Sequence, residues 1–275
     1  MKWKTSAVWA DGTFESNTAP LTGPLDICAR RAAELGYDAL SLTVNRPEDL
    51  DVARVQAVMR QYGLAVSGLA TGRIYTVDGL SLGTANQEQR LAAVHRMLAH
   101  AQTCACLGGA KLIIGAIRGW VHDAGDTERY KTLFRDSIEM ILAGTEKLGV
   151  PVVLEAISHI DSDMYCSVTE TAAFIRSFHS SQLQLQIDSL HLYNNDENFY
   201  PAITELESGM IGQVDISDVN RTAPDGRHFD FPLLLRALKQ CHYQDYLVFE
   251  YKETPPENAA AKGLDYIKSL SGMIG

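Results

Sequence analysis

The feature that most constrains the fold is a regular alternation of apolar runs with helical patterns along all 275 residues. Eight runs are almost continuously apolar, which is typical of parallel strands covered on both sides. They span residues 6–10, 38–44, 65–71, 110–117, 150–157, 183–190, 211–219 and 245–252. Because each strand and helix together take about 30 residues, right-handed crossovers favour closure over an open sheet. The sequence therefore predicts an α/β fold of the (β/α)8 TIM-barrel type.

Amphipathic patterns between these runs predict eight helices. They lie near residues 23–35, 49–62, 87–107, 127–148, 167–178, 200–207, 231–241 and 257–270. Glycines follow the first four at Gly36, Gly63, Gly108 and Gly149, where a left-handed helix end is expected. No linker is evident, so residues 1–275 are interpreted as a single barrel domain. The longest connection, residues 71–86, is predicted to be a structured loop that forms a lid or a substrate wall.

Charge and composition narrow the classes of partner. A formal net charge of −10 argues against nucleic acid, since a nucleic-acid-binding protein carries a basic face. There is no run of about 18 apolar residues and no signal-peptide pattern at the start, so no membrane association is expected. The five cysteines are scattered and odd in number, which is typical of reduced thiols in a cytoplasmic protein.

Four acidic residues stand near the ends of the last four apolar runs: Glu155, Asp188, Asp215 and Glu250. If those runs are adjacent parallel strands, the four side chains converge at one end of the barrel. Any one of them could instead cap a helix or pair with a basic residue. Together they are harder to explain this way, because a buried ring of carboxylates is unstable without a cation. Oxygen donors suit hard divalent ions, so a metal site, and hence an enzyme, is the leading interpretation.

Other polar and aromatic residues follow the predicted strands, on the loops where TIM barrels carry their chemistry. The candidates for substrate binding are His191, Arg221, Arg118, Tyr75, His159, Asp161 and Trp9. Arginine and histidine could donate to hydroxyl or carboxylate groups of a substrate. Trp9 could equally be a core aromatic.

Several stretches together resemble the xylose-isomerase-like barrel family of sugar isomerases and epimerases. They read VSGLATGRIYTVDGLSL (66–82), LIIGAIRG (112–119), LEAISHID (154–161), QIDSLHL (186–192), DISDVNRTAPDGRHFDF (215–231) and YLVFEY (246–251). The family includes the ketose 3-epimerases. The segments 71–82 and 112–119 look most similar to the branch described as 5-keto-L-gluconate epimerases.

The resemblance implies a mechanism for the four acids. By position, Glu155 and Glu250 are the two catalytic carboxylates that remove and return a proton beside a carbonyl. Glu155, Asp188, Asp215 and Glu250 would hold a divalent metal, most plausibly Mn²⁺, with Mg²⁺ or Co²⁺ as alternatives, which stabilises an enediolate. His191 matches a substrate-binding histidine, and Arg221 matches an arginine that steadies a metal ligand or substrate oxygen. The expected partner is a keto sugar or keto sugar acid, and family members often form dimers or tetramers.

The chain also departs from the family pattern, which leaves alternatives open. The fourth metal ligand is usually histidine, and here the usual His-x-His reads Gln213-Val214-Asp215. The stretch after Glu155 also differs from the usual one, which suggests an altered substrate. Besides an epimerase or isomerase, the same proton abstraction would serve a dehydratase or a lyase that cleaves carbon glycosides. The exchange at Asp215 also leaves open a non-catalytic member of the family. A DNA-repair endonuclease is disfavoured by the acidic charge.

Overall fold

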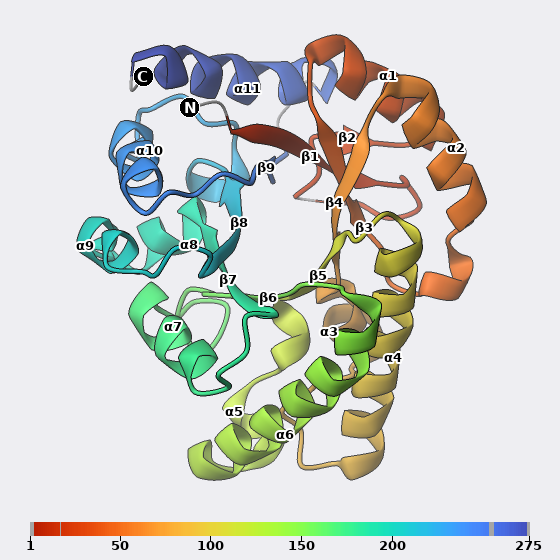
Figure 1. Cartoon of the computed structure of the whole chain (residues 1–275), viewed down its shortest axis with the longest axis vertical. Helices are drawn as coiled ribbons and strands as arrows, with labels where there is room; N and C mark the ends of the chain where they lie inside the picture. The colour runs from red at the N-terminus through yellow and green to blue at the C-terminus, as the bar shows by residue number, and fades with distance from the viewer. Residues whose placement is uncertain (1–2, 17, 253–255, 274–275) are drawn as a thin grey trace.

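The computed structural model describes residues 3–16, 18–252 and 256–273, and its strands form a closed parallel barrel (Figure 1). The strands are β1 (Lys4–Ala10), β3 (Ala39–Thr43), β4 (Ala65–Ala70), β5 (Lys111–Ile114), β6 (Val152–Glu155), β7 (Leu183–Asp188), β8 (Ile211–Ile216) and β9 (Tyr246–Phe249). Each pairs with the next, and β9 pairs back with β1. A two-residue strand, β2 (Leu21–Thr22), extends the sheet beside β1. The predicted TIM barrel is confirmed.

The barrel is surrounded by helices, as Figure 1 shows. All eight predicted helices are present: α1 (Leu25–Leu35), α2 (Val52–Tyr62), α4 (Gln87–Cys106), α6 (Thr127–Thr145), α7 (Val168–Arg176), α9 (Phe199–Thr204), α10 (Phe231–Gln240) and α11 (Pro256–Met273). The shorter α3 (Gly72–Asp78), α5 (Val121–Ala124) and α8 (Ser189–Asn194) were not predicted. Within the described ranges, no helix is both long and apolar enough to cross a membrane.

The helix ends follow the predicted glycine signals. Gly36 ends α1 with φ 81°, and Gly63 ends α2 with φ 67°; both are in the left-handed region. Each donates its N–H back to carbonyls of the preceding turn, which would otherwise lack partners. A residue with a Cβ atom is strained in this conformation, so glycine lets the chain turn directly into the next strand.

The segment 71–86 differs from the predicted loop because its first half is the helix α3. Ile74 and Leu82 are fully buried, and Leu82 N–H donates to the carbonyl of Ile117. Buried apolar anchors, which the loop prediction did not weigh, make this segment a packed wall of the barrel.

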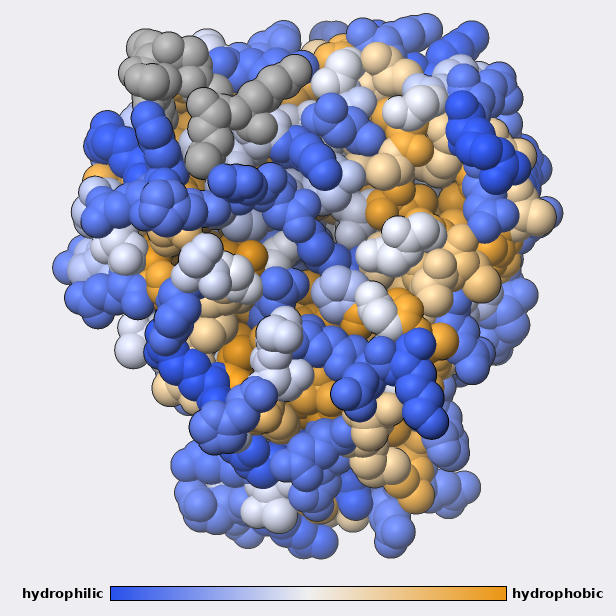
Figure 2. Space-filling model, in the orientation of Figure 1, coloured by the Kyte–Doolittle hydropathy of each residue, from blue (hydrophilic) through white to orange (hydrophobic). Residues whose placement is uncertain are grey.

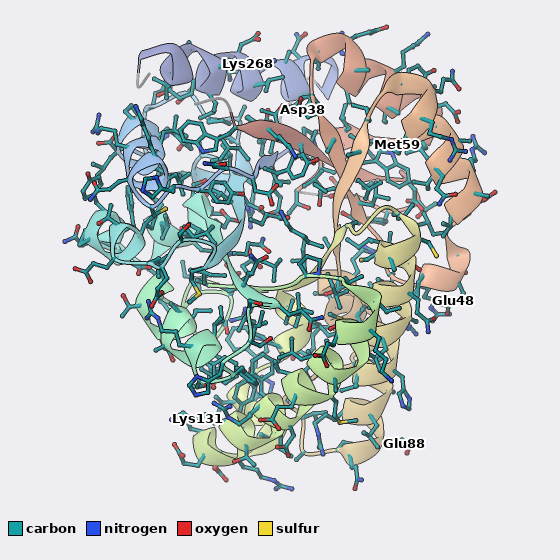
Figure 3. All side chains as sticks on the ribbon, viewed as in Figure 1. Asp38, Glu48, Met59, Glu88, Lys131 and Lys268 are labelled. Carbon is teal, nitrogen blue, oxygen red and sulfur yellow. The ribbon has the colours of Figure 1, made fainter. Side chains whose placement is uncertain are left out.

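Most of the hydrophobic core lies between the strands and the helices. On β1, Ala7 and Trp9 belong to this outer core, whereas Val8 and Ala10 belong to a small separate cluster with Val248 of β9. Since alternate residues of a strand point to opposite sides, the small cluster lies inside the barrel. Side chains fill the ring of strands, and the labelled Glu48, Glu88, Lys131 and Lys268 lie at the periphery (Figure 3). The outer edge of the molecule in this view is largely hydrophilic (Figure 2).

Two of the predicted strands extend beyond the C-terminal ends of the strands in the structure. The run at 110–117 yields a strand that stops at Ile114 and continues as a 3₁₀ turn, Ala116–Arg118. The run at 211–219 likewise stops at Ile216. Most of these extra residues are buried, including Ile117, Ser217 and Asp218 at the barrel mouth. That mouth is where the four acids lie.

Candidate active site

The four acids converge at the mouth of the barrel. Glu155 ends β6, Asp188 ends β7, Asp215 lies in β8, and Glu250 follows β9. In the sheet register, Asp188 stands opposite Asp215. One carboxylate oxygen from each residue lies within 4.8 Å of the others. We call these four residues the acidic cluster. Parallel strands of matched length bring their C-terminal ends together, and this accounts for the convergence.

One guanidinium enters the acidic cluster. Arg221 Nη1 lies 2.5 Å from Asp188 Oδ2 and 3.0 Å from Glu250 Oε2. Arg221 and the preceding Asn220 both have left-handed backbone angles, with φ 56° and 59°. Such angles cost of order 1–3 kcal/mol for a residue with a side chain, and they concentrate at functional sites. The turn after β8 therefore holds a strained conformation that sends Arg221 back into the mouth.

Burial and mutual repulsion shift the acidic cluster towards its protonated form. Burial, followed by the charges of Asp188 and Glu250, raises the pKa of Glu155 well above its usual value. The pKa of Asp215 is raised well above its usual value for the same two reasons. Burial also raises the pKa of Glu250 to about 7, against the opposing charge of Arg221.

Asp188 is the exception. Burial acts to raise its pKa, but the charge of Arg221 and the hydrogen bonds that Asp188 accepts outweigh burial, so its pKa is lowered. One of these bonds comes from Leu190 N–H at 2.7 Å, so Asp188 also caps α8.

His191 links the acidic cluster to the loop after β6. Its Nε2 lies 3.5 Å from Glu155 Oε1, and its Nδ1 lies 3.2 Å from Ser158 Oγ. Ser158 in turn donates to Asp161 Oδ2 at 3.2 Å. Burial lowers the pKa of His191 to about 4, so the imidazole is neutral at neutral pH. It can accept or donate a hydrogen bond without neutralising the cluster.

The charge balance of the acidic cluster fits a divalent cation. Three buried carboxylates and the half-buried Glu250 face one guanidinium, and His191 adds no charge because it is neutral. Among the described residues, Glu155 and Asp215 have no arginine or lysine within ion-pair distance. Oxygen donors converging in a buried site are the set that hard divalent ions prefer. Glu155, Asp188, Asp215 and Glu250 could therefore hold such an ion.

Some predicted substrate-binding residues form no hydrogen bond or ion pair with the carboxylates of the acidic cluster among the described residues. Arg118 is 1% exposed and donates to main-chain carbonyls, including those of Gly115, Met164 and Glu155, so its guanidinium is committed to the scaffold. Trp9 points into the outer core and donates to the carbonyl of Gly23. The interpretation of Trp9 as a core aromatic fits this position better.

Tyr75 and His159 also lie outside the acidic cluster and have neighbours of their own. Tyr75 lies in α3, and burial followed by the nearby Asp123 raises its pKa. His159 is exposed, and its Nδ1 lies 2.6 Å from Asn195 Oδ1. By contrast, Arg221 and His191 contact the acidic cluster directly, and Asp161 is linked to it through Ser158 and His191.

Two glutamines at the acidic cluster were not among the predicted site residues. Gln186 donates to Asp215 Oδ2 and Glu155 Oε1, at 2.8 and 3.3 Å. Gln213 donates to Asp215 Oδ1 at 2.8 Å. The signal that could have found them is spacing, since each stands two residues before a cluster aspartate on a strand and so faces the same side.

Comparison with known proteins places the chain in a family. Residues 29–270 match the family described as "Xylose isomerase-like TIM barrel". The chain belongs to the xylose isomerase-like TIM barrel family. This confirms the resemblance seen in the sequence at the level of the family. The likeness to the 5-keto-L-gluconate branch stays a prediction.

Two relatives of this chain with known activity are sugar epimerases. The chain is 23% identical over 232 residues to 3-dehydro-D-guloside 4-epimerase of Escherichia coli (strain K12), covering 80% of this chain and 84% of that protein. It is 23% identical over 261 residues to L-ribulose 3-epimerase of Mesorhizobium japonicum, covering 94% and 84%. A solved structure of an L-ribulose 3-epimerase superposes with a TM-score of 0.81 at 18% identity, covering 99% and 96%. That superposition supports the barrel fold.

Proposed function

We propose that this chain is a metal-dependent epimerase or isomerase of a keto sugar or keto sugar acid. The observation that carries the proposal is the acidic cluster: four convergent carboxylates, three of them buried and one half-buried, that face the guanidinium of Arg221. The excess negative charge calls for a cation, and two relatives at 23% identity are sugar epimerases.

Glu155, Asp188, Asp215 and Glu250 would hold the cation, and Mn²⁺ is the first candidate. Once bound, a divalent ion supplies Lewis-acid stabilisation of negative charge on a substrate carbonyl oxygen. The protein contributes a buried site with little water, in which charge interactions are stronger than in bulk solvent.

Glu155 and Glu250 would move the proton. They stand on β6 and β9, with β7 and β8 between them, so they approach the cluster from different sides. One carboxylate takes the proton from the carbon beside the carbonyl, leaving an enediolate. The other returns a proton to the opposite face of that carbon, which inverts it. With a pKa of about 7, Glu250 can hold or release a proton near neutral pH.

His191, Arg221 and Asp161 would contact the substrate. Neutral His191 can exchange hydrogen bonds with a hydroxyl, and Arg221 already reaches two cluster acids. Asp161 is exposed on the loop beside His191 and could accept from a sugar hydroxyl. Tyr75 and His159 would bind only the outer part of a substrate, since both lie outside the acidic cluster.

Hydrogen exchange tests the proposal directly. Purified protein with MnCl₂ is incubated in heavy water with a panel of ketoses and keto sugar acids. We expect one substrate to gain deuterium at the carbon beside its carbonyl and to yield its epimer. Glu155→Gln and Glu250→Gln should abolish exchange, whereas Glu207→Gln should not, because Glu207 pairs with Arg176 at the surface.

Other outcomes would change the assignment. Loss of water or release of an aglycone would indicate a dehydratase or a lyase acting through the same proton abstraction. A folded protein that neither binds Mn²⁺ nor exchanges any substrate would be a non-catalytic member of the family.

A further inference from the structure

Two glutamine side chains lie buried beneath the acidic cluster. Gln186 is 2% exposed and Gln213 is fully buried. Gln186 precedes Asp188 by two residues on β7, and Gln213 precedes Asp215 by two on β8. Strand alternation therefore directs both amides into the barrel, one layer below the carboxylates.

Both amides converge on Asp215. Asp215 Oδ2 accepts from Gln186 Nε2 at 2.8 Å, and Asp215 Oδ1 accepts from Gln213 Nε2 at 2.8 Å. Gln186 Nε2 also reaches Glu155 Oε1 at 3.3 Å, so this amide bridges two cluster acids. Each carboxylate oxygen has two lone pairs, so both Asp215 oxygens keep one for a cation. Neutral donors orient the carboxylate without cancelling its charge.

This arrangement leaves both amide oxygens without a partner. Gln186 Oε1 and Gln213 Oε1 are buried and accept no hydrogen bond from the part of the chain that the structure describes. A buried acceptor left unpaired costs about 1–3 kcal/mol. Rotating either amide would place its oxygen against the carboxylate, where two acceptors repel each other.

Asp215 needs such support because the rest of the acidic cluster repels it. Its ligand oxygen lies within 4.8 Å of oxygens from three other acids. Among the described residues, no lysine or arginine forms an ion pair with Asp215. An unsupported aspartate would be expected to rotate away from its neighbours.

We propose that Gln186 and Gln213 form an amide cradle, a pair of positioning residues that hold Asp215 as a cation ligand. The cradle acts through Asp215 and touches no reacting atom. This inference rests on the proposed function, because it assumes that the acidic cluster binds a divalent ion.

The experiment measures Mn²⁺ affinity by calorimetry on the full chain. Gln186→Met and Gln213→Met keep side-chain length and remove the donors. We expect each to weaken Mn²⁺ binding about 10–100-fold, as loss of a partner to a metal ligand does elsewhere, with the larger effect at Gln186. The matched control is Gln184→Met on the same strand, since Gln184 donates to the carbonyl of Gly209 and lies outside the cluster. It should leave the affinity unchanged within about twofold.

A double-mutant cycle separates positioning from general damage to the fold. In an Asp215→Ala background, Gln213→Met should change Mn²⁺ affinity by less than about twofold, because Gln213 has no carboxylate left to hold. Gln186→Met should keep only the smaller part of its effect that acts through Glu155. If a methionine variant does not fold, Gln186→Asn and Gln213→Asn shorten the reach while keeping a polar amide, and should weaken binding in the same way. Circular dichroism melting of the metal-free variants reports folding.

The outcomes distinguish the cradle from the proposed function. Wild-type protein that binds Mn²⁺, with unchanged affinity in both methionine variants, would overturn the cradle and leave the metal site standing. The same would follow if the losses persisted in full in the Asp215→Ala background. Wild-type protein that binds no Mn²⁺ would overturn both proposals.

Discussion

The two ends of the barrel both bury charged groups, but they balance them differently. At the N-terminal end, Lys111 Nζ lies 2.5 Å from Asp245 Oδ2, one positive charge against one negative. At the C-terminal end, four carboxylates share the single guanidinium of Arg221. A balanced pair with one buried member, Lys111, needs no further charge, whereas an excess of one sign needs an ion from outside. The imbalance marks the functional end.

Cavities alone do not separate the two ends. A cavity of about 580 Å³ lies at the N-terminal end, lined by residues that include Lys111, Asp245 and Tyr246. A space of this volume could hold a small molecule. Its one acid, Asp245, already pairs with Lys111, so we assign the cavity no chemistry. We therefore propose the active site from the unbalanced charge of the acidic cluster and not from the volume of a cavity.

The largest effect should come from Glu250→Gln at the mouth. Removing a group that transfers a proton should lower kcat about 10³-fold, near the middle of the range for general acid–base catalysis. The measurement is steady-state turnover of the substrate found by deuterium exchange. Activity within threefold of wild type would remove Glu250 from the mechanism and weaken the contrast between the two ends.

The stability of the metal-free protein should fall as the pH rises. Glu155, Asp215 and Glu250 have raised pKa values, so the folded state holds their protons more tightly than the unfolded chain does. For Glu250 the stabilising contribution is complete below its ordinary pKa of 4.5 and is lost as the pH rises through about 7; Glu155 and Asp215 act in the same direction. For Glu250 alone the loss is roughly 3 kcal/mol.

Thermal melting in EDTA at pH 5, 6, 7 and 8 measures this trend. His191 acts in the opposite sense, because its pKa of about 4 removes stability as the pH falls below its ordinary 6.5. We expect the three acids to outweigh this one imidazole. A Tm that rises steadily from pH 5 to 8 would show that the acidic cluster is not protonated as its surroundings imply.

Divalent metal should stabilise the folded protein by binding to the acidic cluster at the barrel mouth and not to the N-terminal end. At a free Mn²⁺ concentration about 100 times Kd, binding adds about 2.7 kcal/mol, or about 5–10 °C in Tm. EDTA should reverse the shift. Asp215→Asn should reduce it, and Asp245→Asn should not. An equal loss of the shift in both variants would place the metal effect outside the acidic cluster.

The smallest effect should come from the N-terminal end. Asp245→Asn leaves the buried Lys111 without its carboxylate, and because the Asp245 side chain is 39% exposed, solvent limits the cost to about 1–2 kcal/mol. Urea unfolding measures the loss. Mn²⁺ affinity and kcat should remain within about twofold of wild type. A tenfold change in either would show that the two ends are coupled.

Much of this architecture could be predicted because it depends on local pattern. Apolar runs bounded by glycine signals predict the eight strands and eight helices, and strand order then places Glu155, Asp188, Asp215 and Glu250 at one end. Segments without a simple period were harder, such as α3 in residues 71–86, where buried Ile74 and Leu82 select a helix. Arg118 has the residue type of a ligand contact, but full burial commits it to main-chain carbonyls.

The sequence by itself determined the barrel and the gathering of four acids at its mouth, because strand period and chain order are enough to set which side chains share one end. Only the tertiary structure decided how those acids are held. Arg221 reaches Asp188 and Glu250 through a left-handed turn, and Gln186 and Gln213 grip Asp215 from two strands. These contacts join residues far apart in the chain, and their geometry depends on strand register and burial, which no local pattern records.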